Sequence, residues 1–151
     1  MYQKSIVHYI SKIVIDILFY AGIATTLAVP FLSSRFYACI GYTSEAWKIP
    51  FMLVLFFSGA CSVFILFHLK QMYRTLLIGN PFIPDNVNRL RMIAVACLLI
   101  AVIYIGKCFF LFTFGTAIIS LVFIIGCLFC LTLKDLFKQA VNYKAENDLT
   151  I

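Results

Sequence analysis

A long apolar stretch in the second half of the chain limits most strongly what it can fold into. From residue 92 to residue 133 the only charged residue is Lys107. As one helix, these 42 residues would be about 63 Å long, roughly twice the thickness of the hydrocarbon core of a bilayer. The stretch must therefore fold back. Small and polar residues loosen the apolar pattern between residues 110 and 116, so we expect the turn there, with the Lys107 amine reaching a membrane face.

Two further apolar runs lie in the first half of the chain. Only 12% of all residues are charged, against about 25% in a typical soluble domain, so there is too little charge to coat a water-exposed surface. Each run is long enough for one helical crossing. The sequence predicts an all-α fold, a single membrane domain over residues 1–151 with four transmembrane helices. The predicted spans are residues 11–32, 51–70, 91–110 and 114–134.

The lysines and arginines are distributed unevenly between the two sides of these spans. Nine lie near the N-terminus, in the loop 70–91 or in the tail 134–151, and three lie on the other side. Cytoplasmic segments of membrane proteins carry the excess of lysine and arginine. We therefore expect a multi-pass protein with both termini and the loop in the cytoplasm.

The loop carries clear signals for the end of one helix and the start of the next. Gly79 and Pro81 are expected to end a helix that continues from the second span through Ile78, because glycine favours the position just past a helix end. Asp85 or Asn86 is expected to cap the free amides of the following helix.

The tail shows the spacing of an amphipathic helix. Apolar residues recur at intervals of three and four from Leu133 to Val141, and Lys144 falls on the same face. We expect a cytoplasmic helix that continues from the fourth span and either lies along the membrane or packs on the loop. Residues 146–151 then form an acidic tip with an apolar end.

In both segments the chain resembles the YoaS-like bacterial membrane proteins, a domain-of-unknown-function family. The motifs are Gly79-Asn80-Pro81-Phe82 with Asn86 and Arg89-Leu90-Arg91, and Leu136-Phe137-Lys138-Gln139-Ala140-Val141 with Glu146-Asn147-Asp148-Leu149-Thr150-Ile151. The resemblance covers essentially the whole chain and brings no catalytic residues with it. It implies a location in the bacterial cell membrane and a frequent genetic companion, a small helix-turn-helix DNA-binding regulator.

We therefore expect an interaction protein that binds such a regulator through its loop and tail, without touching nucleic acid itself. The acidic tip can compete with DNA phosphate for basic residues of the regulator. The candidate partner-binding residues are Gly79, Asn80, Pro81, Phe82, Asn86, Arg89, Arg91, Glu146, Asn147, Asp148, Leu149, Thr150 and Ile151. A patch of small residues at 58–62 predicts close helix packing and leaves a homo-oligomer open.

Asp16 is the only acid inside a predicted span, and an acid at membrane depth is a functional candidate. It lies about 5–9 Å from the expected inner end of its helix, and Lys12, four residues earlier on the same face, can pair with it. An ion pair that anchors the helix is one interpretation. The alternative is a coupling acid in a small proton-coupled transporter or a self-protection protein.

Cys127 and Cys130 form a Cys-x-x-Cys pair near the expected cytoplasmic end of the last span. A redox pair needs an accessible, reactive thiolate, whereas apolar surroundings favour a packing role. A membrane thiol oxidoreductase that uses this pair is a second alternative. Otherwise we expect no enzyme, no cofactor and no metal site. A disulfide between Cys39 and Cys108 stays open.

Overall fold

The computed structural model describes residues 6–39 and 47–148. The regular structure of these two ranges consists of long helices, and each is apolar and long enough to cross a membrane. The all-α fold class with four spanning helices is therefore confirmed. The helices are α1 (Ile6–Cys39), α2 (Lys48–Ile78), α3 (Pro84–Phe110) and α4 (Phe114–Asp148).

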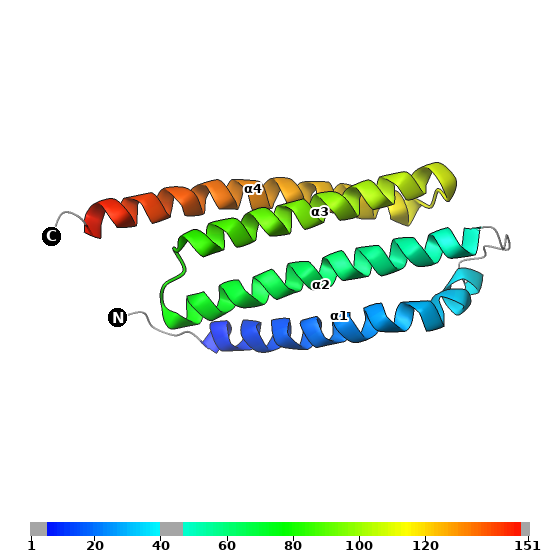
Figure 1. Cartoon of the computed structure of the whole chain (residues 1–151), viewed down its shortest axis with the longest axis horizontal. Coiled ribbons are helices and arrows are strands. Elements are labelled where there is room, and N and C mark those ends of the chain that lie inside the picture. Colours follow the sequence, from blue (N-terminus) through cyan, green and yellow to red (C-terminus); the bar gives the residue numbers. More distant parts are fainter. Residues whose placement is uncertain (1–5, 40–46, 149–151) are drawn as a thin grey trace.

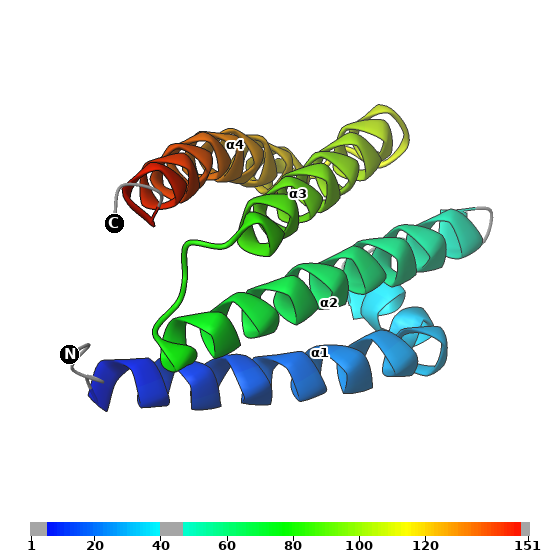
Figure 2. The ribbon, with the colours of Figure 1, turned by 60° about the vertical axis from the view of Figure 1, so that its left-hand side comes forward.

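The helices lie side by side in chain order as an open array (Figures 1 and 2). α1 packs on α2, α2 on α3, and α3 on α4, so that among the described residues α1 and α4 each have one helical neighbour. At one end of the array α1 begins, α2 leads into α3, and α4 ends (Figure 1). We call it the terminal end, and the opposite end, with the α3–α4 turn, the far end.

The turn between α2 and α3 follows the predicted helix end but not the predicted helix start. Gly79, at φ 87°, is the residue just past α2, and this left-handed backbone favours glycine. α3 begins at Pro84 after extended Ile83, and no side chain caps its first amides. The expectation that Asp85 or Asn86 caps this helix was wrong. Proline already removes one amide that needs a partner, and the Asn86 side chain is used elsewhere.

The predicted fold-back of the long apolar stretch is confirmed. α3 ends at Phe110 and α4 begins at Phe114. The Leu111 amide donates a hydrogen bond to the Lys107 carbonyl at 2.8 Å, which closes the last turn of α3. Lys107 thus lies about 5 Å along the helix axis from the end of α3, at the far end of the array.

The packed core lies mainly between α3 and α4. Ile93, Ala94 and Cys97 of α3 form a buried cluster with Cys127 of α4, and Ile65 of α2 packs against it. Small residues on α3 allow the neighbouring backbones to approach, which is how helices associate in lipid. α3, packed on both α2 and α4, is the most buried of the four described spans.

α1 and α2 approach each other closely at Gly59. A Cβ atom at Gly59 would lie 2.8 Å from Thr26 Oγ1 of α1, a distance that real Cβ atoms essentially never show. The Thr26 hydroxyl donates to the Gly22 carbonyl at 2.8 Å, which fixes its position. For Gly59, the small-residue patch predicted at 58–62 does serve close helix packing.

Candidate functional site

The Asn86 side chain holds the turn between α2 and α3 together. It is 1% exposed, and its Nδ2 donates to Thr75 Oγ1 and to the Pro81 carbonyl, both at 2.7 Å. Its Oδ1 accepts a hydrogen bond from the Arg89 guanidinium at 2.8 Å. One buried amide thus links the end of α2, the loop and the start of α3. Buried polar groups with all partners present define one conformation, so the turn is rigid.

Two further contacts extend this network along α2. The Thr75 hydroxyl donates to the Met72 carbonyl at 2.7 Å, and the Arg89 guanidinium donates to the Gln71 carbonyl at a longer 3.4 Å. Arg89 therefore bridges the two helices. This pairing was not predicted, because it joins residues of two different helices, and the periodicity within one helix gives no information about such a contact.

The tail packs on the loop, which is one of the two arrangements expected for it. Lys144 Nζ of α4 donates to Asn80 Oδ1 at 2.7 Å. The Phe82 and Phe137 rings lie with their centroids 5.3 Å apart at a tilt of 55°. α4 continues as one helix from the membrane-spanning part to Asp148, so no hinge separates the tail from the last span. Loop and tail form one surface at the terminal end.

We define the loop–tail surface by six of the exposed residues of these two segments. They are Gly79, Asn80, Phe82, Lys144, Glu146 and Asn147. Lys144 is an addition to the predicted set, and its place on the apolar face of the tail was the signal for it. Asn86 lies beneath this surface, so it positions the loop and has no side-chain atom to offer a partner.

The remaining predicted partner-binding residues lie in different settings. Pro81 and Arg89 are half-buried at the turn, while Arg91 is exposed on α3. Asp148 ends α4, and nothing is described of its side chain. Leu149, Thr150 and Ile151 lie outside the described residues.

Asp16 pairs across two helices. Its Oδ1 lies 2.9 Å from Lys70 Nζ of α2, and the two side chains are 30% and 25% exposed. The Lys70 amine also lies 5.0 Å from the ring centroid of Phe19 and 4.9 Å from that of Tyr20. The expected partner was Lys12 on the same helix, and this expectation was wrong. A cation held between two rings on the facing helix makes the better contact.

This ion pair gives a prediction about the α1–α2 contact. Asp16→Asn and Lys70→Met should each lower the free energy of unfolding, because each leaves a charge at the α1–α2 contact without its partner. The double variant should lose less than the sum of the two. Unfolding by dodecyl sulfate, followed by circular dichroism, measures the cycle. Lys12→Met is the control, and an effect as large as that of Lys70→Met would contradict the pairing.

The cysteines predicted as a possible redox pair lie in the packed core. Cys127 is 8% exposed beside Cys97, and Cys130 packs against the same cluster. All six cysteines carry free thiols, Cys39 and Cys108 included. In the described ranges, no three His, Cys, Asp or Glu side chains are grouped so that they could hold a metal ion.

These features define a class of protein: a multi-pass helical membrane protein with a structured surface at the end of its spans. The model of the family described as "Protein of unknown function (DUF2975)" matches residues 24–151. The chain therefore belongs to the DUF2975 family. Membership in a domain-of-unknown-function family is confirmed, and the YoaS-like name stays a prediction. Neither the curated proteins nor the solved structures gave a match.

Proposed function

We propose that this chain is a membrane-embedded interaction protein, and that its loop–tail surface binds a small cytoplasmic helix-turn-helix regulator. The observation that carries the proposal is the contact of Lys144 with Asn80, because it joins the two segments that were predicted separately to bind the partner. The contact joins residues 64 positions apart in the chain. A protein that served only as a membrane anchor would not need such a contact between its loop and its tail.

The length of α4 supports this surface being presented to water. Its 35 residues make a helix of about 52 Å, well beyond the roughly 30 Å of the hydrocarbon core. The part after Lys134 is rich in charged and amide side chains. In this proposal the terminal end faces the cytoplasm, in accord with the distribution of lysine and arginine.

The rigid turn beneath the surface lowers the cost of binding. A loop that is already ordered loses little conformational freedom when a partner docks, so more of the contact energy appears as affinity. The Asn86 network supplies that order here. The acidic tip, Glu146 and Asp148, adds charge that suits a basic DNA-binding partner. The membrane protein and DNA then compete for the same regulator.

Deletion of residues 146–151 should release the regulator while the spans remain inserted. The measurement is co-purification of the full chain in detergent with the helix-turn-helix protein encoded by a neighbouring gene, followed by titration. We expect affinity to fall at least tenfold, because the acidic groups are lost. Lys144→Ala should also weaken binding, through the loss of its contact with Asn80.

The matched control is Asp135→Asn, which removes an exposed acid from the same helix. Asp135 pairs with Lys134 at 3.0 Å and lies outside the loop–tail surface. Binding that is unchanged after the deletion would show that the tip is not the docking segment. Failure of any helix-turn-helix protein to co-purify with the full chain would refute the proposed partner.

A further inference from the structure

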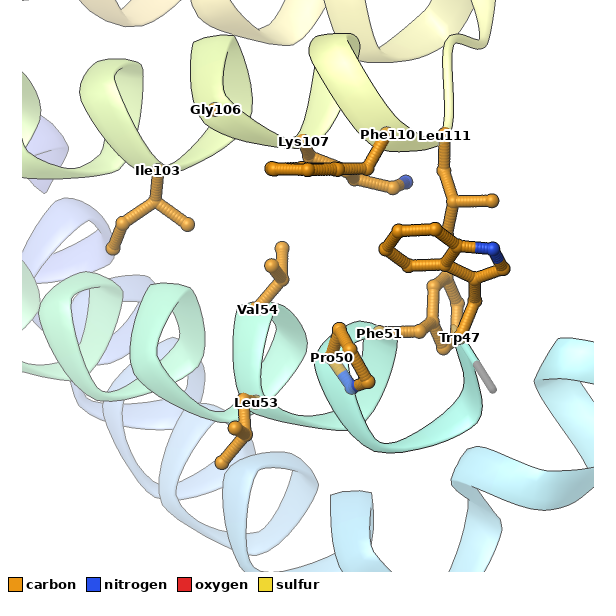
Figure 3. Close-up of a pocket in the computed structure, with 10 residues that line it drawn as sticks. All are labelled: Trp47, Pro50, Phe51, Leu53, Val54, Ile103, Gly106, Lys107, Phe110 and Leu111. Atoms are coloured by element: carbon orange, nitrogen blue, oxygen red, sulfur yellow. The ribbon is translucent and has the colours of Figure 1, made fainter. Parts of the chain in front are cut away.

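A pocket opens between α2 and α3 at the far end of the array, remote from the loop–tail surface (Figure 3). Its volume is about 280 Å³. The residues that matter for its chemistry are Trp47, Phe51, Val54, Ile103, Gly106 and Lys107. All but one of these are apolar or aromatic, and Lys107 supplies a single amine.

The Lys107 ammonium has an unusual environment. It lies 5.2 Å from the ring centroid of Phe51 and donates a hydrogen bond to Thr116 Oγ1 at 3.3 Å. No carboxylate within the described ranges pairs with it. A cation in apolar surroundings is costly unless an anion accompanies it. The site therefore favours a ligand that carries negative charge to this point.

The pocket changes in polarity along the helix axis. Val54, Ile103 and Gly106 line its deeper part, toward the middle of the spans. The Lys107 amine points the other way, toward Trp47 at the far end (Figure 3). A lipid of the leaflet at this end has the same order, with a charged group at the membrane face and acyl chains toward the centre. Tryptophan is also typical of headgroup depth.

We propose that this pocket binds one phospholipid with an anionic headgroup, taken from the leaflet at the far end. The phosphate pairs with the Lys107 ammonium, and the first part of an acyl chain fills the space beside Gly106. A volume of about 280 Å³ is small for a complete ligand. The rest of the lipid stays in the bilayer. Phosphatidylcholine carries the same phosphate, but its choline cation is repelled by the Lys107 ammonium, so the pocket favours a headgroup with net negative charge.

The chain carries its own probe for this site. Trp47 is its only tryptophan and lines the pocket. The full-length protein in neutral detergent is titrated with phospholipids brominated on the acyl chain, which quench tryptophan fluorescence on contact. Brominated phosphatidylglycerol should quench Trp47 at about a tenfold lower mole fraction than brominated phosphatidylcholine. Equal quenching by the two lipids would overturn the proposal.

Substitutions at two positions test the Lys107 charge and the open space at Gly106 separately. Lys107→Met should abolish the preference for phosphatidylglycerol, while Lys107→Arg should keep it within about threefold. Gly106→Leu should reduce quenching by both lipids at least fivefold, because the leucine side chain fills the space that the acyl chain would occupy. A Cβ atom at Gly106 meets no neighbouring atom within 4 Å, so the fold should accept this change. Gly115→Leu, a matched change at an open site outside the pocket, should leave quenching unaltered.

Competition identifies the source of the anion. Inorganic phosphate at millimolar concentration should not restore the fluorescence, since it has no chain to fill the apolar part. Displacement by free phosphate would assign the site to a soluble anion and overturn the proposal for a lipid. Helix content and elution volume of each variant are compared with those of the unchanged protein, and Lys107→Arg keeps the test valid if Lys107→Met misfolds.

Discussion

Asn86→Leu should lower the free energy of unfolding by about 3 kcal/mol. The leucine removes one hydrogen bond each from the Pro81 carbonyl, the Thr75 hydroxyl and the Arg89 guanidinium. Asn86 is 1% exposed, so water cannot easily replace these hydrogen bonds. The cost is that of three hydrogen bonds of one buried amide lost together, at about 1 kcal/mol each. The Thr75 hydroxyl, the Arg89 guanidinium and the Pro81 carbonyl each keep one other contact.

The matched control is Asn88→Leu, two residues further along α3. Asn88 is exposed, so the same chemical change there should alter stability by less than about 0.5 kcal/mol. Unfolding by dodecyl sulfate in mixed micelles, followed by circular dichroism, gives both values. Equal effects of the two substitutions would mean that Asn86 is not the centre of the turn. Under the proposed function, Asn86→Leu should also weaken binding of the regulator, although its side chain touches no partner.

The fold was predictable from length and composition because a membrane leaves a chain few choices. A mostly apolar stretch of 42 residues is too long to cross once, so its length requires a fold-back. The small and polar residues between 110 and 116 indicated the place, and the turn lies between Phe110 and Phe114. Gly79 likewise marks the end of α2 by its backbone preference. Such features depend only on neighbouring residues in the chain, and the structure confirms them.

The pairings across helices were not predictable in the same way. Helical spacing places Lys12 beside Asp16, but the contact goes to Lys70, which is near only because α1 packs on α2. Asn86 stands where a helix cap is expected, yet its amide turns back to Thr75. The sequence singled out both residues. Their partners depend on which helices are neighbours, and the periodicity within one helix gives no information about that.

The two proposed sites lie at opposite ends of the open array. At the terminal end, the loop–tail surface rests on a buried hydrogen-bond network. At the far end, the pocket with Lys107 lies between the same two helices, α2 and α3. α3 passes through the core and joins both sites. α2 also runs from one site to the other, so an effect of the proposed lipid on the loop would pass through these two helices.

Among the described helices, α1 packs on α2 alone. Its attachment therefore depends on the close approach of the two helices at Gly59. Gly59→Leu should lower the free energy of unfolding by about 2 kcal/mol, since the new side chain meets Thr26 before it can pack. The strain can be relieved only if α1 moves away from α2. The Asp16–Lys70 ion pair of the same interface should then weaken as well.

A second substitution tests whether the clash is the cause. Thr26→Ala removes the two closest atoms and leaves the Thr26 Cβ, which lies 3.5 Å from the position that a Cβ at Gly59 would take. Gly59→Leu combined with Thr26→Ala should therefore recover at least half of the lost stability, a coupling that independent sites do not show. Gly115→Leu, in open space, is the control for adding a leucine side chain. Strict additivity of the Gly59 and Thr26 substitutions would show that α1 and α2 do not cross at this point.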